Sequence, residues 1–473
     1  MSASRVQNYR LTLRKMANSD NHNHNAHVAL IPSSGMGHLT PFLRLAVSLI
    51  SHNVRVTLIT AQTTVSLAES QALSCFFSTY PQITASQLPL VPYDSPSEDP
   101  FYIQYEAIRR SSHLLSPILC SITSSLSALI TDMSLASTII PVTQSLNLPN
   151  YVLFTSSAQM STLFLSFHAI AGSRGENDLF TIPGMQPLPI SWIPPPLLSE
   201  KDSLFRTQLM ENGKAMLQAD GILINTFENF EQEPLVALNA GEVITRLPPV
   251  TAIGPFEPCG FERSRSLTWL DGQPMNSVVF VSFGSRTAIS REQNKELADG
   301  LLRSECRFIW VVKEKKVDRE DGKVLDELVD EEFMKKGKDK GLVVNQWVNQ
   351  EQILSHPAVG GFVSHCGWNS VTEAAWHGVP ILAWPQHGDQ KMNAYVLSKR
   401  GLGIWAANWG WGGEMVVKGT EISEKIREVM GNEMLRAQVI KIRENARAAV
   451  ANGGSSHKGV IELIQIWKNK NIK

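Results

Sequence analysis

The sequence predicts an α/β protein of two doubly wound domains, each with a parallel sheet covered by helices on both faces. The chain has 473 residues, which exceeds one ordinary domain and suits two of about 200 to 250. In both halves, short apolar runs alternate with helical patterns, as in buried parallel strands joined by helices. Between the halves, residues 254–266 contain Pro255, Pro258 and Gly260 and are typical of an interdomain linker.

The first domain is expected over residues 27–253. Helices are predicted between its strands, notably over 38–52 and 102–124. Residues 171–200 are rich in proline and predict a long surface loop beside a binding cleft. The predicted strands are the apolar runs at 27–32, 54–60, 128–132, 150–155, 221–227 and 250–254.

The second domain is expected over residues 267–455. A terminal helix over 456–473 is expected to pack back on the first domain, and the charged run 314–330 predicts an exposed excursion. Two such domains in tandem place ligands between them, outside the carboxyl ends of the strands. The predicted strands are 277–283, 307–313, 342–345, 360–364 and 379–383, and the predicted helices are 290–304, 421–430, 433–451 and 455–468.

Charge and cysteine content narrow the class of protein. The 43 Lys and Arg residues nearly balance the 44 Asp and Glu residues, whereas proteins that bind nucleic acid or anionic membranes usually carry a basic excess. No apolar run reaches the roughly 18–20 residues of a membrane span. We therefore expect a cytoplasmic monomer with a small-molecule partner, without a disulfide framework or zinc site, because no CxxC pair occurs among Cys75, Cys120, Cys259, Cys306 and Cys366.

The first 26 residues differ in composition from the rest. Residues 5–15 are basic and lack acids, and residues 20–25 are mostly Asn and His. The apolar core of a signal peptide is missing. The pattern predicts a disordered leader; a transit peptide, or translation from Met16, remains an alternative.

The segment from Trp347 to Gln390 has the chemistry of a nucleotide-sugar site. We expect Trp347 to end a strand, where its indole can stack on a base, an interaction worth about 1–3 kcal/mol. A buried strand then leads through His365 and Gly367 into a helix, whose free N–H groups suit a diphosphate, while glycine allows close approach. Each residue alone also has an ordinary structural explanation, such as a rim tryptophan or a capping histidine, but their combined spacing favours a site.

Across its forty-four positions this segment closely resembles the donor-binding box of plant family 1 UDP-glycosyltransferases, and the likeness extends from about His27 to Trp467. The resemblance implies a GT-B fold, in which two Rossmann-like domains face each other across a cleft. It also implies UDP-glucose as co-substrate, with no cofactor and no metal. The Val348-Asn349 pair departs from the family's usual Ala-Pro or Ser-Pro.

The resemblance also implies roles for individual donor-site residues. Gln350 and Glu373 would accept hydrogen bonds from the ribose hydroxyls. Asp389 and Gln390 would form hydrogen bonds with the sugar hydroxyls, and glutamine at the last position favours glucose. Arg286, beside the second phosphate loop, is either near the leaving diphosphate or merely solvated. The remaining donor residues would contact uracil or the phosphates: Trp347, Val348, His365, Gly367, Trp368, Asn369, Ser370, Gly284 and Ser285.

His38 and Asp132 are the candidate catalytic pair. His38 follows one predicted strand and Asp132 ends another strand of the same parallel sheet, so we expect them to lie close together. They match the family's general base and its buried partner, which orients the imidazole. A helix N-terminus disfavours imidazolium, so we expect His38 to be kept neutral. Alone, each also fits a helix-start or strand-end residue.

A further likeness concerns the acceptor. Asp99-Pro100-Phe101 before Arg109-Arg110, with the strings at 35–43 and 409–412, resembles flavonoid C-glycosyltransferases, which act on phloretin-like dihydrochalcones, 2-hydroxyflavanones or benzophenones. The residues expected at the acceptor are Asp99, Phe101, Phe154 and His387, with the loop near Pro194.

The resulting hypothesis is an inverting C-glucosyltransferase that acts on an aromatic carbon of a polyphenol. The nearest alternative is a flavonoid O-glucosyltransferase, because both reactions use the same base and donor. An NAD(P)-dependent oxidoreductase is disfavoured, since Gly35-Met36-Gly37 is not GxGxxG and no acidic residue follows the second strand. A protein that only binds would not need the His38–Asp132 pair.

Overall fold

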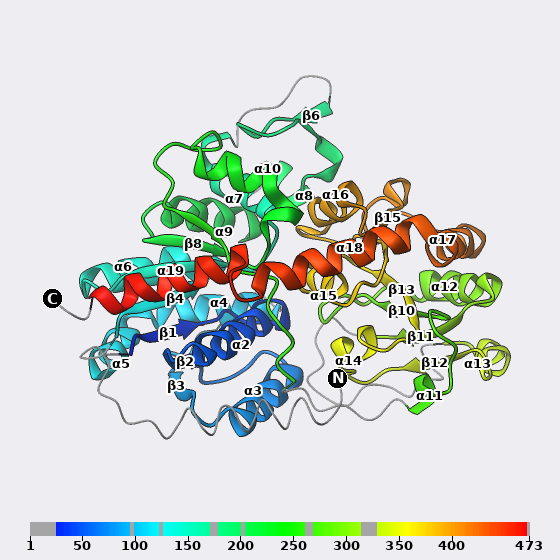
Figure 1. Ribbon diagram of the computed structural model, residues 1–473, viewed down its shortest axis with the longest axis horizontal. Helices are drawn as coiled ribbons and strands as arrows, with labels where there is room; N and C mark the ends of the chain where they lie inside the picture. Colours follow the sequence, from blue (N-terminus) through cyan, green and yellow to red (C-terminus); the bar gives the residue numbers. More distant parts are fainter. Residues whose placement is uncertain are drawn as a thin grey trace.

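The computed structural model describes residues 25–94, 99–122, 126–170, 178–199, 204–260, 268–313 and 329–470 (Figure 1). It confirms the prediction of two parallel-sheet, helix-covered domains. The leader up to residue 24, linker residues 261–266 and most of the charged run at 314–328 lie outside the described residues.

The first domain has a seven-stranded parallel sheet in the order β3-β2-β1-β4-β5-β8-β9. The order reverses between β1 and β4, which pair directly, with Leu30 opposite Ile130. The strands are β1 (His27–Ile31), β2 (Arg55–Ala61), β3 (Thr84–Leu88), β4 (Ala128–Asp132), β5 (Asn150–Phe154), β8 (Gly221–Ile224) and β9 (Val250–Ala252). The helices are α2 (Met36–Ser51), α3 (Leu67–Thr79), α4 (Pro100–Arg110), α5 (Leu115–Ile122), α6 (Ala136–Ser145), α7 (Ala158–Ile170), α8 (Pro195–Leu198), α9 (Leu204–Met216) and α10 (Glu228–Asn239).

The second domain has a six-stranded parallel sheet in the order β12-β11-β10-β13-β14-β15. Here the order reverses between β10 and β13. The strands are β10 (Val278–Ser282), β11 (Arg307–Val311), β12 (Gly341–Val344), β13 (Val359–Ser364), β14 (Ile381–Ala383) and β15 (Gly403–Trp405). The helices are α11 (Thr268–Asp271), α12 (Arg291–Ser304), α13 (Glu331–Gly337), α14 (Gln350–Leu354), α15 (Trp368–His377), α16 (Gln390–Arg400), α17 (Gly419–Gly431) and α18 (Glu433–Val450).

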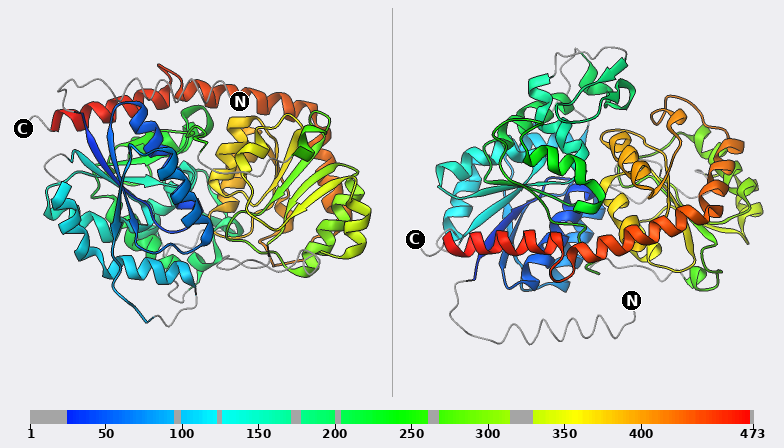
Figure 2. Two further views of the ribbon diagram at one scale, coloured as in Figure 1. Left: turned by 90° about the horizontal axis from the view of Figure 1, so that it is seen from below. Right: turned by 45° about the horizontal axis from the view of Figure 1, so that its top comes forward.

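The last helix, α19 (Ser455–Lys470), returns to the first domain. Figures 1 and 2 show α18 and α19 running in succession along one side of both domains. Trp467 is buried against Tyr151 of β5, with ring centroids 5.5 Å apart. Ser456 also donates to the carbonyl of Gly254, so the end of the chain holds the two domains together.

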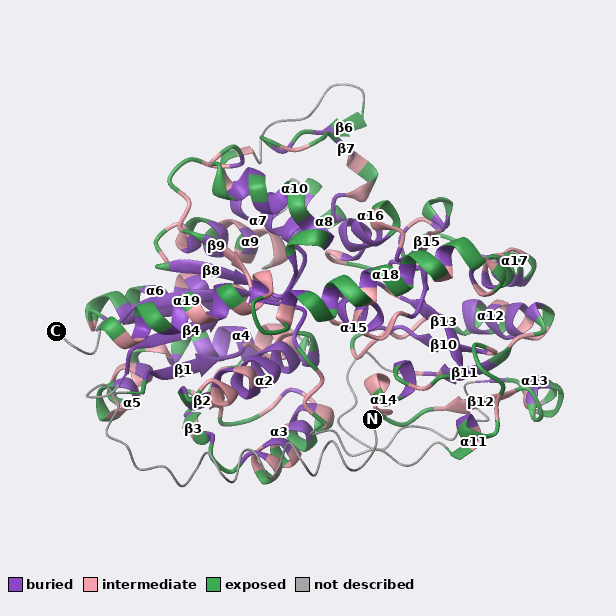
Figure 3. Cartoon of the chain, in the orientation of Figure 1, coloured by how far each residue is buried: buried purple, intermediate pink, exposed green. Residues whose placement is uncertain are grey.

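The central strands of both sheets are buried (Figure 3). Strands β1, β4, β5, β8, β10, β13 and β14 are buried along their whole length, as expected for parallel strands covered on both faces. Within the described ranges, no helix combines the length and apolar character that crossing a bilayer requires.

Several local predictions were wrong. Strands β3 and β15 were not predicted, because one is mostly polar and exposed and the other has only three residues. A small antiparallel pair, β6 (Leu179–Phe180) and β7 (Leu188–Pro189), lies in the predicted loop. The single helix predicted over 102–124 is divided at Ser112–Leu114 by a short 3₁₀ turn. Helix α2 begins at Met36, two residues before its predicted start.

Candidate functional site

A cavity of about 510 Å³ lies where the carboxyl ends of the two sheets face each other. Its first-domain wall includes the first turns of α2, the loop after β5 and helix α7. Its second-domain wall comes from the loops after β10 and β13, together with α14 and α15. In each sheet, a reversal of strand order opens a crevice at this edge, which is where open α/β sheets bind ligands.

His38 and Asp132 meet at the first of these crevices. Nδ1 of His38 lies 2.9 Å from Oδ2 of Asp132, whose side chain is fully buried. The other Asp132 oxygen, Oδ1, accepts the backbone N–H and the hydroxyl of Ser134, so the carboxylate cannot rotate freely. Thr155 places its hydroxyl 3.1 Å from the same His38 nitrogen. His38 lines the cavity, and Nε2 is the ring atom left to face a substrate.

The pKa of His38 differs from the expectation for a helix start. Burial alone lowers the pKa of His38, but the charge and hydrogen bond of Asp132 raise it by more, so the net shift is upward. Arg286 opposes this rise and Asp389 adds to it. The start of α2 therefore does not lower the pKa of His38 overall, because the adjacent carboxylate has the larger effect.

His365 lies at the second crevice, between two glycines. A Cβ atom built on either Gly284 or Gly367 would come within 2.5 Å of its Nε2. Burial lowers the pKa of His365 to about 3, and His387 contributes to the lowering. The ring is therefore neutral and has one N–H to donate, beside the start of α15, where backbone N–H groups suit an anion.

A substitution at Gly284 tests this packing. Gly284→Ala should weaken UDP binding at least about 10-fold, which corresponds to roughly 1.4 kcal/mol, because the new methyl group displaces His365. The matched control is Gly413→Ala: Gly413 also has positive φ but no atom within 4 Å of an added Cβ. Calorimetric titration with UDP measures both variants. Equal affinities in the two would show that the His365 position is unimportant.

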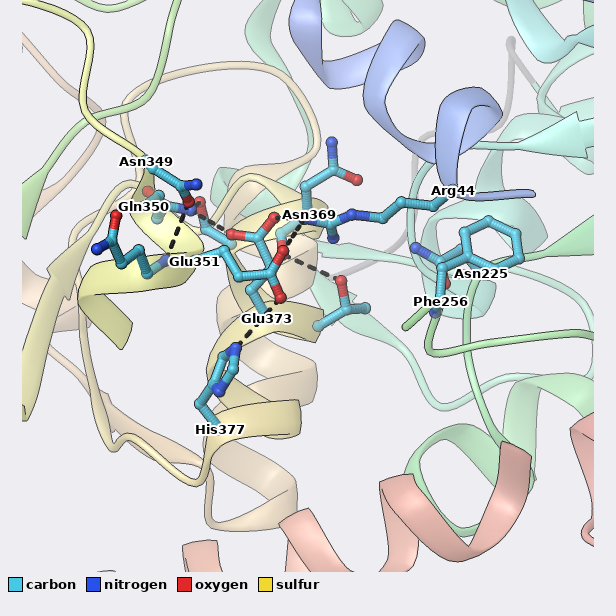
Figure 4. Close-up of polar contacts among 12 residues, drawn as sticks. Arg44, Asn225, Phe256, Asn349, Gln350, Glu351, Asn369, Glu373 and His377 are labelled. Carbon is cyan, nitrogen blue, oxygen red and sulfur yellow. Dashed lines mark hydrogen bonds and ion pairs between the residues drawn. The ribbon is translucent and has the colours of Figure 1, made fainter. Parts of the chain in front are cut away.

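The ribose end of the predicted donor segment forms one hydrogen-bonded group (Figure 4). Gln350 donates through Nε2 to Ser370 Oγ (3.0 Å) and to Glu373 Oε2 (2.7 Å).

Trp347 lies three residues beyond the end of β12, not at a strand end as predicted, and is 44% exposed. Its indole is therefore accessible to a stacking base.

Trp368 and Asn369 contact the first domain in this structure. The indole N–H of Trp368 donates to the backbone oxygen of Asn225 (2.8 Å), and the ring packs near Phe230. Asn369 donates through Nδ2 to the carbonyl of Gly37 (3.1 Å). The Trp368 side chain thus joins the domains, which leaves its backbone for a phosphate. Val348 also lines the cavity.

Asp389 and Gln390 are held in place by their surroundings. Asp389 Oδ2 accepts from Asn393 Nδ2 (2.8 Å) and from the hydroxyl of Ser156 in the first domain. Gln390 Oε1 accepts the backbone N–H groups of Gln386 and His387, at 2.8 and 3.0 Å. Both residues line the cavity.

The predicted acceptor residues are only partly at the cavity. His387 lines it, but Phe154 is fully buried against Phe164 in the core, so that prediction is wrong. Asp99 accepts the backbone N–H of Phe101 and caps α4; neither residue lines the cavity. The expected loop near Pro194 does line the cavity, through Pro194 and Pro196. The apolar residues that sequence reasoning missed are Met133, Met160, Phe164 and Phe205.

Arg286 links the Asp99-Pro100-Phe101 motif to the cavity. Its guanidinium lies 3.7 Å from the centre of the Phe101 ring, and Arg286 itself lines the cavity. Surrounding protein lowers the pKa of Arg286, and the carboxylates of Asp99 and Glu69 partly offset this. An arginine remains charged in proteins, so Arg286 supplies positive charge close to His38.

The described residues contain no group of three or more His, Cys, Asp or Glu side chains that could hold a metal ion. The polar groups gathered at the cavity are instead hydrogen-bond donors and acceptors. They suit an uncharged sugar, a base and a diphosphate.

The chain is similar in sequence to proteins of one known family. Residues 266–444 match the family described as UDP-glucoronosyl and UDP-glucosyl transferase. The chain is 53% identical to UDP-glycosyltransferase 708G2 of Citrus unshiu, over 96% of its own length and 99% of that protein's. It is 47% identical to UDP-glycosyltransferase CGT of Oryza sativa subsp. indica, over 93% and 96% of the two chains.

Among solved structures, the fold is similar to the crystal structure of LpCGTa in complex with UDP. The TM-score is 0.84 at 46% sequence identity, covering 94% of this chain and 99% of the other.

Proposed function

Because the chain belongs to the plant family 1 UDP-glycosyltransferases, we propose that it transfers glucose from UDP-glucose to a ring carbon of a polyphenol, with inversion at the anomeric carbon. Transfer of a glycosyl group from a UDP-sugar follows from the family. The proposal adds the sugar, the acceptor and the bond that is formed.

The observation that carries the proposal is that His38, held by the buried Asp132, and the donor segment line the same cavity from opposite domains. A histidine on one wall can reach an acceptor hydroxyl while the sugar is held on the other. Fixing two reactants in this way removes much of the entropic cost of their meeting.

In the proposed reaction, Nε2 of His38 removes a phenolic proton from the acceptor. Asp132 holds the imidazole through Nδ1 and stabilises the imidazolium that forms. The phenolate directs electron density to its ortho carbon, which attacks the anomeric carbon from the face opposite UDP. The bond from the anomeric carbon to the β-phosphate oxygen breaks, and its electron pair leaves with UDP. The ring carbon then loses its proton to water, which restores the aromatic ring as a phenolate, and the His38 imidazolium returns its proton to the phenolate oxygen.

The donor end of the cavity stabilises the leaving diphosphate in this scheme. Gly284, Ser285 and the first residues of α15 offer backbone N–H groups, and neutral His365 offers a ring N–H. Asp389 and Gln390 face the sugar, and the resemblance to glucose-using relatives supports UDP-glucose. UDP-galactose should be used with a kcat/KM at least about 10-fold lower.

The acceptor end supports a flat, largely apolar molecule with phenolic groups. Methionine and phenylalanine side chains such as Met133, Met160 and Phe164 line this end, while His38 and Arg286 supply the polar contacts. The relatives named CGT and the 99–101 motif support attack by carbon. We therefore propose phloretin-like dihydrochalcones, 2-hydroxyflavanones or benzophenones as acceptors.

Product stability decides between carbon and oxygen attack. Incubation of the enzyme with UDP-glucose and phloretin should give a glucoside that survives hot acid, because an aryl carbon–carbon bond is not hydrolysed. The comparison is an authentic phloretin O-glucoside heated in the same tube. A product that releases glucose alongside this standard would contradict the C-glucoside and identify an O-glucosyltransferase.

A further inference from the structure

A single arginine of the first domain meets two carboxylates of the second. Nη2 of Arg44, on α2, lies 2.7 Å from Oε1 of Glu373 on α15 and 3.1 Å from Oε2 of Glu351 on α14. Figure 4 shows the Arg44 side chain extending from its helix to both carboxylates. The Arg44 side chain is only 5% exposed, so this contact is shielded from solvent screening.

The contact fixes the orientation of Glu373. Arg44 donates to Oε1, and Gln350 donates to Oε2 from the other side at 2.7 Å. A carboxylate oxygen has two lone pairs, so each oxygen can still accept one hydroxyl. Glu373 lines the cavity, and a carboxylate held on both sides presents its remaining lone pairs in one direction.

Charge gives the contact a second consequence. Glu351 and Glu373 both line the cavity and share one guanidinium nitrogen, close to where a negatively charged diphosphate would bind. Without that cation, two carboxylates in a poorly solvated place would repel each other and the donor. Glu351 has a further partner in His377, at 3.3 Å.

Resting on the donor role proposed for Glu373, we propose that Arg44 is a positioning residue for the nucleotide, contributed by the first domain. It orients Glu373 toward the ribose hydroxyls and balances the charge of the two carboxylates. The ribose site is thus complete only when the two domains are closed on each other.

Helix α2 connects this contact to the chemistry. His38 and Arg44 lie on the same helix, six residues apart, which corresponds to about 9 Å along its axis. Asn369 of α15 also bonds the carbonyl of Gly37, next to His38, and α2 packs directly against α15. One rigid element therefore sets the distance between the general base and the ribose contact.

The test compares UDP with 2′,3′-dideoxyuridine 5′-diphosphate, which lacks both ribose hydroxyls, by calorimetric titration of the full chain. The wild type should bind UDP about 10-fold or more tightly, because hydrogen bonds to a charged group are among the stronger ones. In Arg44→Gln, which retains an N–H donor but no charge, the preference should fall below about 3-fold. Arg44→Lys retains the positive charge, so its preference for UDP should be larger than that of Arg44→Gln.

A matched control is Arg303→Gln. Arg303 forms an ion pair with Asp299, but both side chains are exposed, so the preference for UDP should equal that of the wild type. If Arg44→Gln kept the full preference, or merely bound both nucleotides equally more weakly, the positioning role would be overturned. A wild type without any preference would instead refute the ribose role of Glu373, while glucosyl transfer itself could still be measured.

Steady-state kinetics and a second variant complete the test. In Arg44→Gln, KM for UDP-glucose should rise about 10-fold, and kcat at saturating donor should stay within about 3-fold. A fall in kcat with unchanged KM would indicate a structural role only and overturn the proposal. If Arg44→Gln does not fold, Glu351→Gln leaves Arg44 to Glu373 alone and should retain the preference for UDP; its loss would contradict the proposal.

Discussion

Replacing His38 by glutamine should lower kcat by about 100- to 10,000-fold, the usual contribution of a general base, and leave the affinity for UDP within about 2-fold. The large effect on rate follows because glutamine cannot take up the phenolic proton. Affinity for UDP is retained because the residues expected to hold the nucleotide belong to the second domain, on the opposite wall of the cavity. Initial rates with UDP-glucose and phloretin, with a UDP titration of the same preparation, measure both quantities.

The matched control for this variant is His113→Gln. His113 is exposed, lies in the 3₁₀ turn after α4, bonds the carbonyl of Arg110 and does not line the cavity. Its substitution should leave kcat unchanged. A His38→Gln enzyme that retained more than about a tenth of the wild-type rate would show that another group removes the proton.

Asp132→Asn should have the second-largest effect, on both rate and pH dependence. In the wild type, burial lowers the pKa of His38, but Asp132 raises it by more. Loss of the carboxylate should therefore lower the pKa of His38 and move the acid limb of the kcat/KM profile to lower pH. The maximum rate should nevertheless fall about 100- to 10,000-fold, because an amide does not hold the required tautomer or stabilise the imidazolium.

The His38–Asp132 pair should also make the free energy of unfolding depend on pH. The pKa of His38 is raised in the folded protein, so the pair stabilises the fold fully below the unfolded pKa of histidine, near 6.5. This stabilisation is lost as the pH rises through the folded pKa.

The control for Asp132→Asn is Asp271→Asn, which removes the carboxylate from an exposed pair with His356 at 3.3 Å. Measurement of kcat/KM across the pH range should show no shift for Asp271→Asn. An unchanged acid limb in Asp132→Asn would mean that this limb reports a group other than His38.

Much of the fold could be predicted because its central strands are short, continuous apolar runs between helices. Burial on both faces requires such runs, and β1, β4, β10 and β13 have them. Edge strands lack this requirement. Strand β3 reads Thr-Ala-Ser-Gln-Leu and is largely exposed, so hydrophobic pattern alone does not distinguish it from a loop.

Most of the predicted donor residues could be placed together because they lie within the continuous segment 347–390, and Gly284 and Ser285 follow another strand end. The acceptor wall could be predicted only at the proline-rich loop, because its other apolar side chains come from α7, α9 and the turn after β4, which only the packed structure brings together. Phe154 illustrates a local error: it is the last residue of β5 and packs into the core, whereas Thr155 and Ser156, just beyond the strand, line the cavity.

The contacts between the two domains could not be predicted from the sequence either. Arg44 lies on the buried side of α2, where an arginine is unexpected unless it is paired. That anomaly signals a partner, but the identity of the partner depends on how the domains are placed. The Asn369–Gly37 and Trp368–Asn225 hydrogen bonds join residues more than 140 positions apart for the same reason.

The most direct test of the proposed reaction is a crystal structure of the enzyme with UDP and phloretin bound together. We expect uracil stacked on Trp347, the ribose hydroxyls on Glu373, and a phenolic oxygen within hydrogen-bond distance of His38 Nε2, with its ortho carbon turned toward the diphosphate. A phloretin molecule bound in the cavity with no hydroxyl near His38, or with UDP away from Trp347 and Glu373, would contradict the account.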